Sequence, residues 1–173
     1  WLLESKKRGC KSFAVNSDLE QTIDFSSLIF SRSLVMNGFI FWTNTNFESA
    51  DFCYKSIFNN AAFTGYARFN NATFSQSAGF SNVTFFDRSE FDNVTFFGVA
   101  GFSNSIFSDE TQFYEASFSN EARFRRTRFS GNTNFEKATF SGNADFYIAS
   151  FFDHCNFKQA KFSGQAFFIN SIF

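Results

Sequence analysis

The stretch FEKATFSGNADFYIASF, residues 135–151, carries the period that decides the fold. Its phenylalanines stand at positions 135, 140, 146 and 151, so the gaps between them are five, six and five residues. The same alternation runs along the chain as two series with a step of eleven residues, one from Phe25 to Phe168 and one from Phe30 to Phe173. Each series has 14 positions, and 27 of these 28 positions are Phe. An internal period of this kind predicts a repeat architecture.

A small residue stands two positions before most of these phenylalanines, most often Ala. Residues two apart on an extended strand face the same way, so each unit should point a small residue and a Phe inward and the polar residue between them outward. Most remaining residues are Ser, Asn, Gly, Asp or Glu, which form turns. Steps of five and six residues do not keep one narrow stripe on a helix. The pattern therefore predicts an all-β solenoid of short strands and corners.

Four consecutive units resemble the pentapeptide-repeat family, whose consensus is A(D/N)Lxx with Leu or Phe at the centre. They are ADFYI (144–148), ASFFD (149–153), CNFKQ (155–159) and AKFSG (160–164). The resemblance covers about residues 17–173 and implies a right-handed quadrilateral parallel β-helix with the central residue inside. Because every second unit has one extra residue, it implies about seven coils of 22 residues with a Phe-filled core. We expect the extra residue to bulge two opposite corners, such as SGN at 130–132 and 141–143, and to leave the faces intact.

Composition indicates one solenoid domain, residues 19–173, behind an N-terminal leader or cap, residues 1–18, because no linker divides the chain. The 15 basic and 16 acidic side chains give a net charge of −1, so a nucleic-acid partner is not expected. The three cysteines, Cys10, Cys53 and Cys155, are far apart and lack the spacing of metal ligands, which indicates a reducing compartment.

The two ends of the sequence carry further expectations. WLLESKKRGCK, residues 1–11, fits the end of a membrane helix with a basic flank, but we favour a frayed cap. The expected location is the cytoplasm or the cytoplasmic side of a membrane, with membrane contact only through residues before Trp1. Phe173 leaves the last aromatic layer without a polar cap, so we expect the natural protein to continue or this end to stack on another subunit.

One face of the predicted helix gathers large apolar side chains. A coil of 22 residues aligns Trp42, Phe86 and Phe152 just after the central Phe, with Ile40 and Ile106 in the neighbouring column. Clustered exposed aromatic residues mark interaction sites, so these five residues are the candidate protein contacts. The alternative is that the aromatic rings fold over the corner and cap the edge of the core.

Charged residues form two weaker candidates. A basic patch is expected around FRRTRF, residues 124–129. Its arginines are Arg123, Arg125, Arg126 and Arg128, which could hold phosphate or an acidic partner or simply balance nearby carboxylates. An acidic stripe on another face contains Glu48, Glu90, Asp92, Glu115 and Glu136, interrupted by Arg68, Lys137 and Lys158. Resemblance to gyrase-targeting family members would make the stripe a DNA mimic, but a solvated polar face is the simpler account.

Two patterns follow from the repeat itself. Thr and Ser recur on one face in a ladder that could bind ice, but Phe97, Asp51 and Lys161 interrupt it. Asn-X-Thr sequons begin at three positions spaced by eleven residues, Asn71, Asn82 and Asn93. Because the repeat itself produces them, they are weak evidence for secretion or glycosylation.

No residue is assigned to catalysis, to a cofactor or to a metal. The single histidine, His154, lacks a nucleophile or carboxylate that the spacing would bring beside it. We therefore expect a non-enzymatic structural or protein-binding rod whose partner is another protein or a second copy of this chain. The alternatives are a DNA-mimicking protein that binds a topoisomerase and an ice- or surface-binding solenoid.

Overall fold

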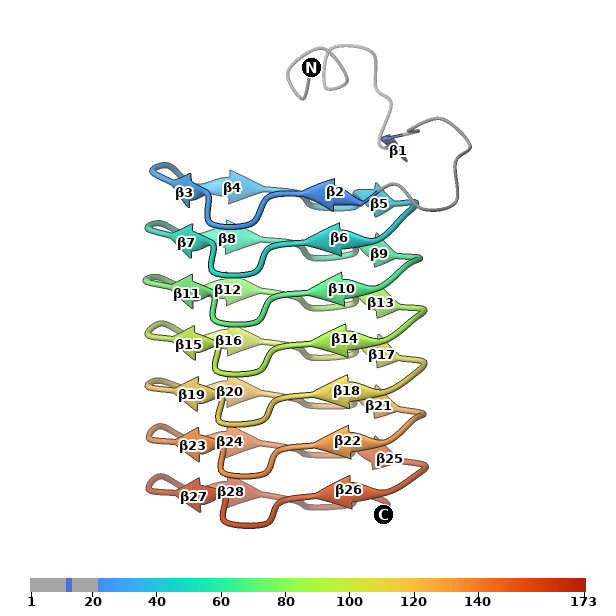
Figure 1. Ribbon diagram of the computed structural model, residues 1–173. Coiled ribbons are helices and arrows are strands. Elements are labelled where there is room, and N and C mark those ends of the chain that lie inside the picture. Colours follow the sequence, from blue (N-terminus) through green and yellow to red (C-terminus); the bar gives the residue numbers. More distant parts are fainter. Residues whose placement is uncertain (1–11, 14–21) are drawn as a thin grey trace.

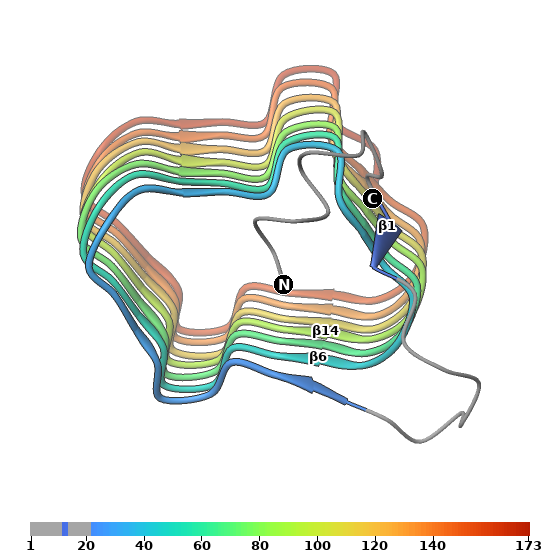
Figure 2. The ribbon, with the colours of Figure 1, turned by 90° about the horizontal axis from the view of Figure 1, so that it is seen from above.

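The computed structural model describes residues 12–13 and 22–173, and these residues form a four-sided parallel β-helix (Figures 1 and 2). One coil contributes one two-residue strand to each of four seven-stranded sheets, which we name A to D. No described residue belongs to a helix that is long and apolar enough to span a membrane.

The four sheets are the four sides of the rod. Sheet A contains β1 (Ser12–Phe13), β5 (Ile40–Phe41), β9 (Ala62–Phe63), β13 (Thr84–Phe85), β17 (Ile106–Phe107), β21 (Arg128–Phe129) and β25 (Ser150–Phe151). Sheet B contains β2 (Ile23–Asp24), β6 (Thr45–Asn46), β10 (Ala67–Arg68), β14 (Ser89–Glu90), β18 (Thr111–Gln112), β22 (Thr133–Asn134) and β26 (Cys155–Asn156). Sheet C contains β3 (Ile29–Phe30), β7 (Asp51–Phe52), β11 (Thr73–Phe74), β15 (Thr95–Phe96), β19 (Ser117–Phe118), β23 (Thr139–Phe140) and β27 (Lys161–Phe162). Sheet D contains β4 (Leu34–Val35), β8 (Ser56–Ile57), β12 (Ala78–Gly79), β16 (Ala100–Gly101), β20 (Ala122–Arg123), β24 (Ala144–Asp145) and β28 (Ala166–Phe167).

The register confirms the predicted coil of 22 residues. Thr84, for example, pairs in parallel with Ile106, which is 22 residues later, and the other strands from β2 onward keep this step. The pairing of Ser12 with Ile40 spans 28 residues, so β1 joins sheet A outside the regular period and within the expected leader. Every equivalent position therefore lies directly above its counterpart in the next coil.

The corners are of two kinds. The six-residue gaps connect sheet A to sheet B and sheet C to sheet D, so the extra residue lies at two opposite corners and leaves the faces intact, as expected. The bulge is elsewhere, however: Figure 2 shows that the five-residue connections, which follow sheets B and D, project as outward steps, while the six-residue corners are rounded. The extra residue thus widens its corner without making it protrude.

The projecting corners are turns that need a left-handed residue. In the turn after β6, the amide of Ala50 donates to the carbonyl of Phe47 at 3.1 Å, and Ser49 between them has a φ of 58°. Positive φ at the third turn position is typical of Gly and Asn. The equivalent position is Asn in six turns, Asn60, Asn71, Asn82, Asn93, Asn104 and Asn170, and Gly in another, Gly38.

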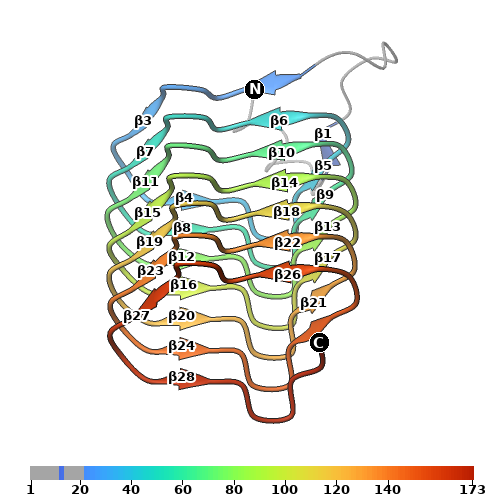
Figure 3. The same ribbon diagram turned by 60° about the horizontal axis from the view of Figure 1, so that its bottom comes forward.

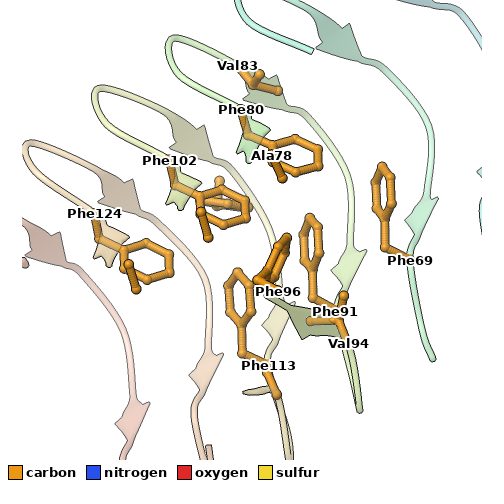
Figure 4. Packing of buried hydrophobic residues seen from close by; sticks show 14 of the residues in the cluster. Phe69, Ala78, Phe80, Val83, Phe91, Val94, Phe96, Phe102, Phe113 and Phe124 are labelled. Atoms are coloured by element: carbon orange, nitrogen blue, oxygen red, sulfur yellow. The ribbon is translucent and has the colours of Figure 1, made fainter. Parts of the chain in front are cut away.

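The interior is a stack of phenylalanine rings (Figure 4). Within a column the rings lie nearly parallel, as for Phe80 and Phe102, whose centroids are 4.9 Å apart with planes 3° apart. Across the interior they meet edge to face, as for Phe91 and Phe102 at 5.5 Å and 86°. Offset stacks and edge-to-face contacts are the arrangements that aromatic pairs favour. The central phenylalanines from Phe41 to Phe151 are buried, which confirms the Phe-filled core.

The two ends of the rod are less enclosed than its middle. In the coil that begins at β26 and lies at the C-terminal end of the ribbon in Figure 3, the inward residues are less covered. Phe157, Phe162 and Phe168 are half-buried, and Phe173 is exposed. Ile172 forms a single parallel bridge with Ser150, which carries the chain back to the edge of sheet A.

Candidate protein-binding face

Sheet A brings the predicted apolar contacts onto one side of the rod. The register aligns Trp42, Phe86 and Phe152 in the column after the central Phe, and Ile40 and Ile106 in the column before it. Trp42 is 54%, Phe86 56% and Phe152 54% exposed, and Ile106 is 40% exposed. Ile40 is half-buried. All three aromatic side chains are therefore accessible to a partner.

The aromatic side chains are separate anchors rather than one continuous patch. Thr64 lies between Trp42 and Phe86, and two serines, Ser108 and Ser130, lie between Phe86 and Phe152 in the same column. At about 4.8 Å per coil, the anchors are spaced by roughly 10 and 14 Å. The face thus alternates bulky and small side chains along the rod.

The basic patch meets this face at one corner. The guanidinium carbon of Arg128 lies 4.3 Å from the centroid of the Phe152 ring, in the geometry of a cation–π contact. Arg126 occupies the projecting turn between sheets D and A with a φ of 53°. Neither arginine has a carboxylate within ion-pair distance among the described residues.

The other two arginines of the patch are already paired. Arg123 bonds to Glu121 at 2.6 Å, and this contact lowers the pKa of the Glu121 carboxyl. Arg125 lies 3.6 Å from Asp145 and stacks over Tyr147 at 4.8 Å. The predicted group of four arginines therefore divides into two that are neutralised and two that remain available beside sheet A.

The acidic stripe on sheet B is interleaved with arginines. Arg68 lies 3.9 Å from Glu48 and 3.7 Å from Glu90, while Arg88 lies 2.9 Å from Glu90 and 3.2 Å from Glu110. Farther along, Lys137 bonds to Glu115 at 3.1 Å. The stripe is a ladder of alternating charge, which is not the uniform negative surface of a phosphate backbone.

Two charged residues beside sheet B, Arg88 and Glu110, were not among the residues singled out from the sequence. Arg88 and Glu110 lie at the corner between sheets A and B, in the same column as Tyr66, and the 22-residue spacing of 66, 88 and 110 was a usable signal. Burial raises the pKa of Tyr66 above its ordinary value. Tyr66 also lines a polar hollow of about 310 Å³ at the N-terminal end of sheet B, together with Thr22, Asp24, Asn44, Thr45, Asn46 and Arg68.

Sheet C carries the hydroxyl ladder. Thr73, Thr95, Ser117 and Thr139 are in register. Asp51 and Lys161 flank these four residues in the same column, and Phe97 projects from the adjacent column with 55% of its surface exposed. The regular hydroxyl array therefore covers only part of this side.

The cysteines that the structure describes, the histidine and the sequon asparagines do not come together in one site. Cys53 and Cys155 are free thiols, and burial raises the pKa of Cys155 to about 12. His154 is exposed, and its backbone amide donates to the side chain of Asp153 at 2.8 Å. No group of three or more potential metal ligands occurs among the described residues. The sequon asparagines are exposed and occupy projecting turns, and Cys10 lies outside the described residues.

These features define a structural repeat solenoid. Phenylalanine rings fill its interior, and its charged, polar and exposed aromatic side chains lie on its outer faces. The family model for pentapeptide repeats (9 copies) matches residues 58–106 and 102–147, which together span 58–147. The chain belongs to the pentapeptide-repeat family, whose members are generally non-enzymatic. Among curated proteins, none matches the chain.

Proposed function

We propose that this protein is a non-enzymatic rod that presents sheet A to a protein partner. The observation that carries the proposal is the exposure of Trp42, Phe86 and Phe152 on one side of a rigid solenoid. Aromatic residues are enriched among the side chains that dominate binding energy at interfaces. Large exposed apolar residues on a stable surface are otherwise an aggregation hazard.

The core supports the proposal because it holds the face in place before binding. Phe85, Phe107 and Phe129, the inward residues behind the face, are fully buried and stack at 4.7 and 4.9 Å. Each coil is also tied to the next by backbone bonds, such as that from Phe86 to Phe63 at 2.9 Å. A preorganised surface loses little conformational freedom on association, so more of the contact energy is expressed as affinity.

Site-specific photo-crosslinking tests the proposal. A photoreactive residue replaces Ser130 on sheet A or, as the matched control, Ser119 on sheet C, and the labelled protein is incubated with an extract of its source cells. We expect protein crosslinks from position 130, their loss in Trp42→Ser/Phe86→Ser/Phe152→Ser, and their retention in Phe97→Ser. Equal crosslinking from both sheets, or crosslinks that survive the triple substitution, would contradict the proposal.

A further inference from the structure

We infer that the partner of sheet A is a second copy of this chain, bound face to face with the two rods parallel. The inference rests on the proposed function and adds the identity of the partner. It follows from the size and charge of the side chains in the two outward columns of sheet A. The column before the central Phe is Ile40, Ala62, Thr84, Ile106, Arg128 and Ser150, and the column after it is Trp42, Thr64, Phe86, Ser108, Ser130 and Phe152.

From the third coil of this face onward, each coil has one bulky and one small outward residue. Phe86 is bulky beside Thr84, and in the next coil the order is reversed, with Ile106 before the central Phe and Ser108 after it. The following coil keeps the reversed order, with Arg128 before the central Phe and Ser130 after it. The last coil returns to the first order, with Ser150 before the central Phe and Phe152 after it. The bulky residue thus changes column while the total volume in each coil stays similar.

A two-fold axis parallel to the rod converts this pattern into self-complementarity. It places the column before the central Phe of one copy opposite the column after it in the other, at the same height. The facing pairs are Phe86 with Thr84, Ile106 with Ser108, Arg128 with Ser130, and Phe152 with Ser150. Each pair joins a bulky side chain to a small one, as close packing between two surfaces requires. Antiparallel rods would instead set Phe86 against Phe152 and Ser108 against Ser130.

The charges at the two edges of sheet A fit the same arrangement. The edge toward sheet D carries Arg126, and the edge toward sheet B carries three exposed aspartates, Asp87, Asp109 and Asp153. The two-fold axis brings the arginine edge of each copy against the aspartate edge of the other. Arg126 is level with Gly131 of the other copy, and Asp109 and Asp153 are one coil, about 5 Å along the rod, below and above that level. Each of these two aspartates uses Oδ1 to accept a local backbone amide, so the second oxygen can face the partner.

Two properties of the rods set the strength and stoichiometry. Both copies have the same 22-residue coil, so their coils stay level along the whole face. The four coils from Thr84 onward pair a bulky residue with a small one, whereas the two coils before them pair Trp42 with Ile40, two apolar side chains, and Ala62 with Thr64, two small ones. A face about 29 Å long and roughly 16 Å wide buries on the order of 900 Å² over both copies, which is below the usual size of a stable interface. The geometry therefore favours a reversible dimer that is closed by its two-fold symmetry.

Sedimentation velocity over a concentration series measures this association. The mass of the unmodified protein should rise from one chain toward two and stop there. Phe86→Ser/Phe152→Ser should weaken association at least tenfold, and Phe97→Ser, which alters an equally exposed phenylalanine on sheet C, should leave it unchanged. Growth beyond two chains would show end-to-end stacking and would overturn the inference.

Reversing the charges at the two edges of sheet A tests the proposed dimer more sharply. Arg126→Glu/Arg128→Glu makes both edges acidic, and Asp109→Lys/Asp153→Lys makes both more basic, so each variant alone should associate at least tenfold more weakly than the unmodified protein. A 1:1 mixture should recover the association, because every acidic edge then faces a basic edge.

A mixture that associates no more tightly than either variant, or an unmodified protein that is monomeric at every concentration, would overturn the inference. Crosslinks from Ser130 to a different protein, with the unmodified protein monomeric, would leave the proposed function standing and remove only self-association. Thermal melting of each variant separates lost association from lost folding.

Discussion

Single residues in this rod are constrained mainly by the residue above and below them in the neighbouring coils. The projecting turns show this for backbone conformation, because the third position has positive φ in every coil whether its residue is Asn, Ser or a less suitable type. Ile148 is the clearest mismatch: it is β-branched and has a φ of 57°. A β-branched residue in this region is strained, so the repeat imposes the conformation on Ile148.

Replacing Ile148 should therefore stabilise the protein. Asn104, two coils earlier, and Asn170, in the next coil, occupy the equivalent turn position. Ile148→Asn should raise the free energy of unfolding by roughly 1 kcal/mol, since it relieves backbone strain of about that size. Chemical denaturation measures the change, and Asn104→Ile should give the opposite sign. A destabilised Ile148→Asn would mean that side-chain packing outweighs the strain.

Glycine at a rounded corner should be required for coil stacking. A Cβ atom on Gly98 would lie 2.5 Å from the backbone carbon of Gln76 in the preceding coil, whereas a Cβ on Gly101 would meet nothing closer than 3.6 Å. Gly98→Ala should cost about 1–3 kcal/mol, as overpacking does. Gly101→Ala should be neutral or slightly stabilising. Similar melting temperatures for the two variants would contradict this reading.

Asp92 should make stability depend on pH. Burial raises the pKa of its carboxyl, and the neighbouring Glu90 adds to this, while Oδ1 accepts the amide of Tyr114 at 2.9 Å. A raised pKa in the folded state favours the protonated form, so the associated stability is present at low pH and lost as the pH rises through that pKa. Asn70, one coil earlier, makes the same bond to the amide of Asp92 as a neutral side chain.

Asp92→Asn should therefore stabilise the protein at pH 7 by less than about 1 kcal/mol, because solvent screens a partly exposed carboxylate. The advantage should shrink as the pH falls through the raised pKa of Asp92 in the folded state, and it should be gone below about 4, the ordinary pKa of Asp, where the carboxyl is protonated in both states. Urea denaturation at several pH values checks this, with Asn70→Asp as the reverse change. A constant difference between Asp92→Asn and the unmodified protein at all pH values would contradict it.

At the scale of elements, two-residue strands are too short to be stable singly, and the columns of phenylalanine rings hold them together. Phe102 shows the density of these contacts, since it stacks on Phe80 at 4.9 Å and on Phe124 at 5.1 Å and meets Phe91 and Phe113 edge on. The alternating gaps of five and six residues were sufficient to predict these columns, because a period applies to every unit at once.

What the period could not reveal depends on contacts between particular side chains or on departures from the period. The stacking of Arg128 on Phe152 requires the conformation of a long side chain, which spacing does not determine. The 28-residue step between β1 and β5 departs from the 22-residue repeat, so the spacing of the phenylalanines could not predict it. The protruding corners were assigned to the wrong gaps, since the outward step comes from the left-handed turn rather than from the extra residue.

Removal of one ring should damage the whole column. Phe102→Ala leaves a cavity in the middle of the stack and should lower the free energy of unfolding by about 3–5 kcal/mol. Phe97→Ala, five residues earlier and 55% exposed, should cost far less. Denaturant titration of both variants provides the comparison, and equal losses would show that the interior is not the main source of stability.

At the scale of the whole molecule, the rod is a one-dimensional stack in which each coil contacts its neighbours and one side carries the exposed aromatic anchors. Sheet B is occupied by its own ion pairs, and sheet C carries hydroxyls and one exposed aromatic residue, Phe97, whereas sheet A carries three, so sheet A is the side that we propose as the binding face. If sheet A is the binding face, its aromatic side chains become covered when the protein associates.

The fluorescence of Trp42 should report directly whether sheet A becomes covered, because this residue is 54% exposed on sheet A. The measurement is acrylamide quenching of Trp42 fluorescence in Trp1→Phe, from dilute to concentrated protein and with any crosslinked partner. We expect quenching to fall as the mass per particle rises, while a tryptophan moved to sheet C in Trp1→Phe/Trp42→Phe/Phe97→Trp stays equally quenched. Quenching of Trp42 that is unchanged while the particle mass doubles would contradict the assignment of sheet A as the binding face.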